Sequence, residues 1–169
     1  YIFVYTPLKQ KSVIALYVGA IPGAIPPVMG WTIVMGTMDL MAWFLFTFLF
    51  IWQIPHFMAI SIYLAKDYGS AKIFVYPNEF GMRVTQWAIL LFTTLLGVAA
   101  YFPVWSNLQS SVAFGRFSLF MSASFIAMAL RVFIIKYENT EELKYWAKAY
   151  FYGSIIYLPL ILGAMIFLK

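Results

Sequence analysis

Cysteine is absent from the 169-residue chain, and charged side chains are scarce. Without cysteine the chain forms neither disulfides nor thiolate metal sites, although this absence does not identify a compartment. Only 10% of its residues are charged, against about a quarter in a soluble domain. With 64% hydrophobic and 21% aromatic residues, the chain lacks the polar surface of a soluble protein. Its net charge of +5 gives no reason to expect nucleic acid as a partner.

Long charge-free runs take the place of that polar surface. A helix needs about 20 apolar residues to cross the hydrocarbon core of a membrane. Four runs reach this length, and a fifth does so when extended through Arg131 to Ile135. Between the first two runs, Gly36 to Asp39 is expected to form a tight turn with Asp39 as a helix N-cap. We predict an all-α polytopic transmembrane helix bundle, one domain over residues 1–169, with five spans at 13–36, 40–64, 83–103, 112–135 and 147–168.

Basic residues gather at one end of the predicted spans. Lys9 and Lys11 precede the first span, and other basic residues lie in the connections after the second and fourth spans. The opposite side receives only Arg116 and Lys169. By the positive-inside rule, the N-terminus and the 66–83 loop face the cytoplasm. The sequence therefore predicts an integral membrane protein of defined orientation.

The first span carries three prolines in its middle: Pro22, Pro26 and Pro27. Each proline removes one backbone donor and clashes with the previous turn of the helix. In lipid, a broken helix needs protein or a cavity beside it to satisfy the freed carbonyls. We therefore expect a kinked, broken helix that forms a cavity wall. Close helix packing through small residues is the alternative interpretation.

The second span and the loop after it hold the only histidine of the chain, His56, and one of its two aspartates, Asp67. At about 100° per residue, Trp52, His56, Tyr63 and Asp67 fall within an arc of ~60° on one helix face. Along that face His56 and Asp67 would lie roughly 16 Å apart, too far to hold the same atom but suited to two ends of one large site. A polar side chain within a span is costly and usually faces the bundle interior, so His56 and Gln53 are candidate functional residues.

The charged residues at the cytoplasmic interface have two interpretations each. Asp67 is either a loop charge paired with a lysine or one ligand of a hard cation such as Mg²⁺, which prefers one or two carboxylates plus substrate phosphates. Lys9 and Lys11 are either positive-inside anchors or cationic donors to an anionic head group at the membrane surface.

Four motifs together resemble one family of membrane enzymes. They are Tyr5-Thr6-x-x-Lys9, Gly23-Ala24-x-Pro26-Pro27-x-x-Gly30-Trp31, Trp52-Gln53-Ile54-Pro55-His56-Phe57 and Lys66-Asp67-Tyr68. The combination is similar to the protohaem IX farnesyltransferases (haem O synthases), which belong to the UbiA-type membrane prenyltransferases, and it covers essentially the whole chain. The resemblance implies a nine-helix bundle around a central cavity, of which this chain would be about the last five helices. Because the chain opens on Tyr1 with a short apolar run, we expect an N-terminally truncated protein that is inactive alone.

The resemblance implies transfer of a farnesyl group from farnesyl diphosphate to a vinyl group of haem b. Water adds in the process, which gives the hydroxyethylfarnesyl group of haem O. Mg²⁺ and basic residues would neutralise the leaving diphosphate. Asp67 would be the metal ligand, with catalytic roles for Lys9 and Lys66. His56 would contact haem, as an iron ligand or as a base. The other implied substrate-binding residues are Gln53, Trp52, Tyr63, Tyr5 and Lys11.

The resemblance also implies surroundings and partners. We expect contact with membrane lipid and partners among the proteins of haem a and terminal-oxidase biogenesis. A bacterial inner membrane is the expected location, with the mitochondrial inner membrane as the alternative. Two other functions stay open at this point. One is a prenyltransferase acting on a quinone precursor or another lipid acceptor. The other is a non-enzymatic membrane protein, a transporter subunit or assembly factor, because broken helices and a buried histidine also suit a transport path.

Overall fold

The computed structural model describes residues 8–9, 11–70, 73–135 and 140–168, without the side chain of Lys66. Within these ranges every regular element is a helix, and the five long ones are sufficiently apolar to cross a membrane. The predicted all-α bundle with five spans is therefore confirmed. The long helices are α2 (Ala15–Met35), α3 (Leu40–Tyr63), α6 (Gly81–Trp105), α7 (Val112–Leu130) and α8 (Thr140–Phe167). The short ones are α4 (Ala65–Ser70), α5 (Tyr76–Glu79) and the 3-10 helix η1 (Arg131–Ile134).

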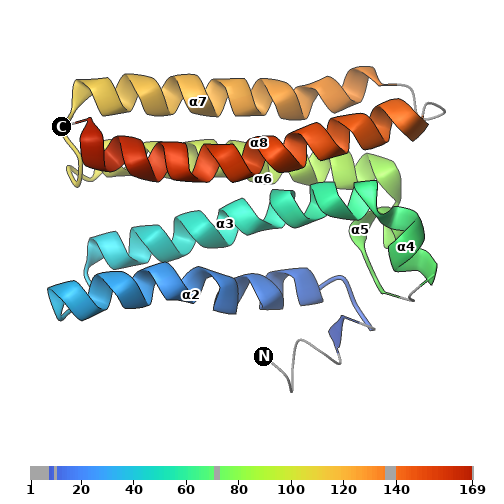
Figure 1. Cartoon of the computed structure of the whole chain (residues 1–169), viewed down its shortest axis with the longest axis horizontal. Coiled ribbons are helices and arrows are strands. Elements are labelled where there is room, and N and C mark those ends of the chain that lie inside the picture. The colour runs from blue at the N-terminus through green and yellow to red at the C-terminus, as the bar shows by residue number, and fades with distance from the viewer. Residues whose placement is uncertain (1–7, 10, 71–72, 136–139, 169) are drawn as a thin grey trace.

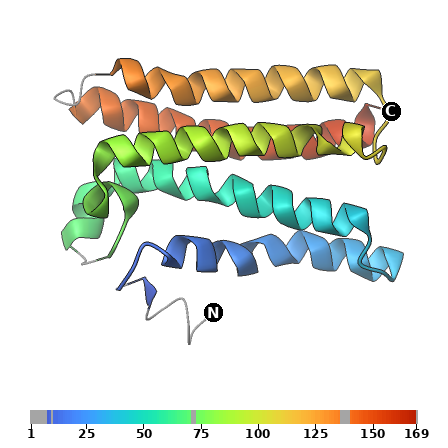
Figure 2. The ribbon, with the colours of Figure 1, turned by 180° about the vertical axis from the view of Figure 1, so that it is seen from behind.

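The long helices run up and down between two ends of the molecule (Figure 1). Four of them form a closed ring of contacts, in which α3 packs on α6 and α8 while α7 packs on the same two helices from the opposite side. Seen from behind, α6 lies between α7 and α3 (Figure 2). The fifth long helix, α2, packs on α3 outside this ring. Helices α4 and α5 lie at one end of the molecule, next to the start of α2 (Figure 1).

The ring of four helices closes around aromatic side chains of α8. Tyr150 and Tyr157 stack against Phe125 of α7 with ring centroids 4.7 and 4.9 Å apart. Their hydroxyls form hydrogen bonds with Thr93 of α6 at 2.5 Å and with Ser122 of α7 at 3.1 Å. Both tyrosines are at most 2% exposed. A buried hydroxyl without a partner would be costly, so each tyrosine joins α8 to its neighbours through both its ring and its oxygen.

The turn between α2 and α3 is fixed by Gly36 and Asp39, as the sequence predicts. Gly36 follows α2 with a φ of 72° and donates its backbone N–H to Thr32, in a left-handed conformation that glycine adopts without strain. Oδ1 of Asp39 accepts hydrogen bonds from the backbone N–H of Ala42 at 3.0 Å and from the indole N–H of Trp31 at 2.9 Å. One carboxylate therefore caps α3 and ties it to the end of α2.

The prolines of α2 do not break it. The prediction of a broken helix is wrong, because α2 is one α-helix with Pro22, Pro26 and Pro27 inside it. Each proline removes its own backbone donor and crowds the previous turn, but the residues around it keep their helical conformation. Pro22 and Pro26 are one turn apart, so the hydrogen bonds lost at these two residues fall on one side of the helix. The backbone hydrogen bonds of the other residues keep α2 helical. The prolines do not line the cavity described below, although the first turns of α2 do.

The last helix begins earlier than the predicted span. The sequence predicts a span over residues 147–168, but α8 runs without interruption from Thr140. Glu141 and Lys144 form an ion pair at 2.9 Å in its first turns. Acidic residues at a helix N-terminus interact favourably with the helix dipole. This interaction stabilises the first turns of α8, and the charged turn therefore continues directly into the apolar helix.

Helices α2 and α3 approach closely where Gly23 faces Gln53. Nε2 of Gln53 donates hydrogen bonds to the backbone oxygens of Ala20 at 3.2 Å and of Leu49 at 3.1 Å. Both amide hydrogens are therefore used. A Cβ atom added at position 23 would lie 2.0 Å from Oε1 of Gln53. The missing side chain of Gly23 leaves the space that this buried amide occupies.

We expect Gly23→Ala to destabilise the bundle, because the Gln53 amide has to move away and loses its two hydrogen bonds. The expected loss is about 1–3 kcal/mol, measured as lowered thermal stability of the detergent-solubilised protein. Gly30→Ala is the matched control, since a Cβ there meets nothing within 4 Å. In a Gln53→Ala background, Gly23→Ala should be far less harmful. Equal effects of Gly23→Ala in both backgrounds would contradict the role assigned to the close approach.

Candidate functional site

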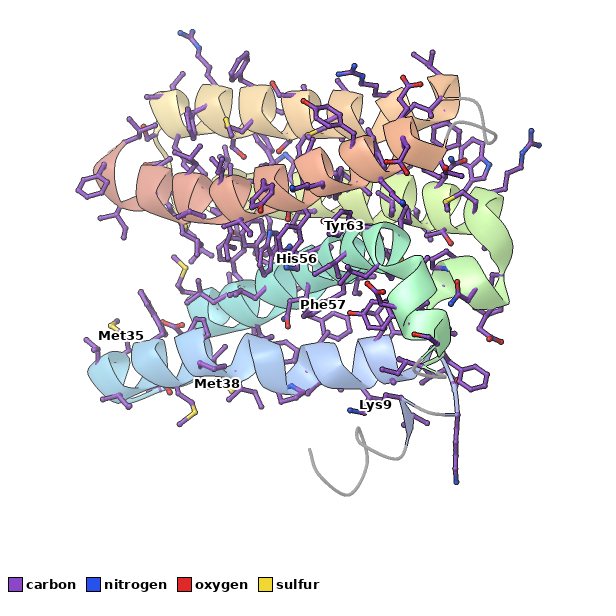
Figure 3. The ribbon with its side chains drawn as sticks, turned by 45° about the vertical axis from the view of Figure 1, so that its right-hand side comes forward. Lys9, Met35, Met38, His56, Phe57 and Tyr63 are labelled. Carbon is purple, nitrogen blue, oxygen red and sulfur yellow. The ribbon has the colours of Figure 1, made fainter. Side chains whose placement is uncertain are left out.

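A cavity of about 150 Å³ lies at the end of the bundle that carries α4 and α5. Its wall combines the start of α2, the C-terminal half of α3 and the segment from α4 to α5. Figure 3 shows Phe57 projecting from α3 towards α2, with Lys9 beside the start of α2. The lining is mostly apolar, and its polar groups come from Lys9, Ser61, Tyr68 and Tyr76. The cavity thus combines an apolar interior with one cation and several hydroxyls.

Hydrogen bonds join the separate parts of this wall. The hydroxyls of Tyr17 on α2 and Tyr76 on α5 form a hydrogen bond with each other. The backbone N–H of Phe74 donates to the backbone oxygen of Lys9 at 3.2 Å. These two contacts attach Phe74 and Tyr76 to the start of α2, and both of these residues line the cavity.

His56 lies on another side of α3, against α8. Its ring stacks between Trp52, at a centroid distance of 4.7 Å, and Phe151 of α8, at 4.6 Å. Nδ1 of His56 is 2.6 Å from Oγ of Ser154. The indole N–H of Trp52 donates to the backbone oxygen of the same Ser154 at 2.8 Å. Two side chains of α3, one helical turn apart, therefore hold one residue of α8. We call His56 together with the flanking rings of Trp52 and Phe151 the histidine slot.

Tyr63 extends this face of α3 towards the end that carries α4. Nζ of Lys148 on α8 lies 5.9 Å from the centre of the Tyr63 ring, within the range of a cation–π contact. Trp52, His56 and Tyr63 thus all face α8, as the helical period predicts.

Asp67 does not continue that face. Helix α3 ends at Tyr63, and Leu64 leaves the helical conformation with φ −104° and ψ 22°. Asp67 belongs to α4, which turns away from the axis of α3 (Figure 1). The prediction of one helix face from Trp52 to Asp67 is wrong because the backbone bends at Leu64. Asp67 is exposed at the end of the molecule that holds the cavity, and the next residue, Tyr68, lines the cavity.

The other predicted site residues divide into three groups. Lys9 lines the cavity, whereas Lys11 is exposed outside its wall. Gln53 is buried in the contact between α2 and α3, with both amide hydrogens already donated. Tyr5 and the side chain of Lys66 lie outside the described residues.

The structure adds residues that the sequence interpretation did not single out for the site, mainly Tyr68, Tyr76 and Ser154. Tyr68 stands inside the Lys66-Asp67-Tyr68 motif, so the motif itself is the signal for it. Tyr76 carries no pattern that distinguishes it from the other tyrosines. Ser154 is a small polar residue in an apolar span, and such residues often mark helix contacts. That signal indicates packing but does not identify His56 as the residue opposite.

Few side chains in the part of the chain that the structure describes could coordinate a metal ion. No group of three or more His, Cys, Asp or Glu side chains is placed there to hold one. The carboxylate of Asp67 is exposed and has no ion pair or hydrogen bond among the described residues. Mg²⁺ commonly takes one or two carboxylates and completes its shell with water and phosphate oxygens. Asp67 therefore fits Mg²⁺ as one ligand beside a phosphate-bearing molecule.

Comparison with known proteins gives consistent matches over nearly the whole chain. The sequence profile of the UbiA prenyltransferase family matches residues 1–165. The chain is 38% identical over 165 residues to a protein named protoheme IX farnesyltransferase from Anaeromyxobacter dehalogenans (strain 2CP-C), covering 98% of the chain and 54% of that protein. A protein of the same name from Anaeromyxobacter sp. (strain Fw109-5) is 40% identical over 165 residues, covering 98% and 53%.

A more distant relative, protoheme IX farnesyltransferase 2 of Bacillus subtilis (strain 168), is 32% identical over 169 residues, covering 99% of the chain and 52% of that protein. The chain therefore spans about half the length of the curated relatives that it matches. No solved structure matches it significantly.

Removing the hydroxyl of Tyr17 should loosen the wall of the cavity. In Tyr17→Phe the Tyr76 hydroxyl loses its partner, worth about 1 kcal/mol. Hydrogen exchange of the α5 backbone should then be about fivefold faster in a mass-spectrometric measurement. Tyr152→Phe is the control, because Tyr152 is 53% exposed and lies away from the cavity wall. Unchanged exchange in α5 of Tyr17→Phe would show that the hydrogen bond does not hold this segment.

Proposed function

Because the chain belongs to the UbiA prenyltransferase family, we propose that the full-length protein transfers a farnesyl group from farnesyl diphosphate to a vinyl group of haem b. Diphosphate would leave and water would supply the hydroxyl of the new hydroxyethylfarnesyl group, so that the product would be haem O. The names of the aligned relatives support this acceptor, since they match over 98% or more of the chain. The observation that carries the proposal is the presence of two distinct sites around α3, an apolar cavity with Lys9 in its wall and the histidine slot.

The cavity suits farnesyl diphosphate. An isoprenoid chain is apolar and needs a wall such as that formed by Leu16, Phe57 and Phe74. The diphosphate carries negative charge and needs cations and donors, which Lys9 and the hydroxyls of Tyr68 and Tyr76 would supply. Lys66 and Lys11 would add positive charge at the same interface.

The proposed chemistry needs the diphosphate to leave from an allylic carbon. Mg²⁺, when bound, would neutralise the charge that develops on the leaving diphosphate. Asp67 would hold the ion together with phosphate oxygens, and Lys9 would place a second positive charge near them. The apolar wall would exclude water from the reacting carbon, because water would otherwise trap the allylic cation.

The histidine slot suits haem. The rings of Trp52 and Phe151 cover the faces of the His56 ring, so His56 would meet the iron of a flat, apolar porphyrin through its Nε2 edge. Tyr63, on the same face of α3, would contact the acceptor nearer the cytoplasmic end. Gln53 would act indirectly, by holding α2 against α3.

The chain is an integral membrane protein, with five helices long and apolar enough to cross a membrane. We place the protein in a bacterial inner membrane, with α4 and α5 on the cytoplasmic side by the positive-inside rule. Proteins of haem a and terminal-oxidase biogenesis are its proposed partners.

Asp67→Asn tests the metal role. It should lower farnesyl transfer by about 100-fold or more in the full-length protein, because it removes a charge from the Mg²⁺ site, while thermal stability stays unchanged. The assay follows Mg²⁺-dependent diphosphate release and haem O by chromatography. Glu79→Gln is the control, since Glu79 is another exposed carboxylate, on α5. Wild-type rates in Asp67→Asn would refute the metal role, and prenylation of a quinone precursor in place of haem would refute the acceptor.

Lys9 and Lys11 should differ in their contribution to the binding of farnesyl diphosphate, although the sequence pattern does not distinguish them. Lys9→Gln is expected to raise the KM for farnesyl diphosphate about tenfold, since a hydrogen bond to a charged group contributes about 1.5–3 kcal/mol. Lys11→Gln should change KM less than twofold because Lys11 is outside the cavity wall. Steady-state kinetics of the two variants side by side measure the difference. An equal rise in KM would mean that the cavity does not hold the diphosphate.

A further inference from the structure

We propose that Ser154 is a positioning residue that fixes the tautomer of His56, so that Nε2 bears a free lone pair and coordinates the iron of the haem substrate. The inference rests on the proposed function for the identity of the ligand. It goes further in choosing between the two roles that the sequence leaves open for His56, and in assigning a function to a residue of α8.

The Ser154 hydroxyl has only one proton to donate, and this determines the tautomer of His56. Oγ of Ser154 lies 2.6 Å from the backbone oxygen of Phe151 and 2.6 Å from Nδ1 of His56. A carbonyl oxygen only accepts hydrogen bonds, so the single hydroxyl proton of Ser154 points to Phe151. The hydroxyl oxygen must then accept from His56, which places the imidazole proton on Nδ1. In the neutral ring Nε2 consequently carries the lone pair.

Nε2 is the ring nitrogen that remains for an incoming ligand. It makes no hydrogen bond within the described part of the chain, where His56 bonds only through Nδ1. No fully buried side-chain nitrogen or oxygen of the described residues lacks a partner. Nε2 is therefore not fully buried, even though His56 as a whole is only 9% exposed.

The surroundings of the ring favour a neutral ligand over a base. Its neighbours are Trp52, Phe57, Phe151 and the Ser154 hydroxyl, and none of them carries a charge. A base would become an imidazolium here without a carboxylate to stabilise it. A metal ligand stays neutral, and ligating histidines usually donate their other N–H to an oxygen acceptor, as Nδ1 does to Ser154.

The slot is held rigidly enough to present Nε2 in one direction. Trp52 and Phe151 stack on the ring at interplanar angles of 24° and 30°. Trp52 also donates to the backbone oxygen of Ser154, so the residue that orients the imidazole is itself held by α3. Ser154 is 0% exposed, and water cannot replace its hydroxyl from outside.

The test is spectroscopic and uses the full-length protein in detergent, titrated with haem b in its ferrous form. Wild-type protein should show the iron–histidine stretch in resonance Raman spectra. His56→Ala should lose this band, and added imidazole should restore it. Ser154→Ala should keep histidine ligation but bind haem about tenfold more weakly, with the iron–histidine stretch at lower frequency because Nδ1–H has lost its acceptor.

Ser122→Ala is the matched control, since Ser122 is also a buried serine with one side-chain hydrogen bond, to Tyr157. It should leave the iron–histidine stretch and the haem affinity unchanged. The inference is overturned if His56→Ala retains the wild-type band, or if Ser154→Ala behaves like Ser122→Ala. Haem O formation is measured on the same samples. Farnesylation by wild type without a His56-dependent band would refute the ligand role and leave the proposed function standing. A His56-dependent band without farnesylation would do the reverse.

Discussion

Polar side chains buried in α3 join it to its neighbours on two sides, and the arrangement of both sites depends on them. Gln53 bonds to the backbone of α2, while Trp52 and His56 bond to Ser154 of α8. Lipid offers no hydrogen-bond partners, so a polar group inside a span needs one from a neighbouring helix. These contacts set how α2 and α8 lie against α3.

The position of α3 separates the cavity from the histidine slot. The cavity lies where α3 meets the start of α2 and the segment after α4, whereas the slot lies where α3 meets α8. Phe57 follows His56 directly in sequence, yet it lines the cavity and also contacts the His56 ring at its edge, with centroids 5.3 Å apart. One aromatic residue therefore touches both sites, and the helix that divides them also connects them.

The parts of the fold that follow from local chemistry were predictable. The apolar runs indicate the five long helices, Gly36 and Asp39 indicate the first turn, and helical periodicity brings Trp52, His56 and Tyr63 to one face. The failures come from effects that residue patterns do not contain. Nothing in the sequence around Leu64 distinguishes a bend from a continuing helix, so the relation of Asp67 to His56 was predicted wrongly. The prolines of α2 suggested a break in the helix, because the sequence pattern does not show how the remaining backbone hydrogen bonds compensate for the donors that the prolines remove. The pairing of His56 with Ser154 joins residues 98 positions apart, and no local pattern specifies such a contact.

The bend at Leu64 has a mechanical consequence. A continuous helix would transmit any displacement at Asp67 directly to His56, as a rigid lever does. In this protein the helix is interrupted, since α3 ends one residue before Leu64 and α4 begins one residue after it. A displacement at Asp67 therefore does not reach His56 along one straight helix axis. The connection between the two ends of the segment passes instead through Leu64, whose backbone bonds to Ile60 in α3 and to Tyr68 in α4.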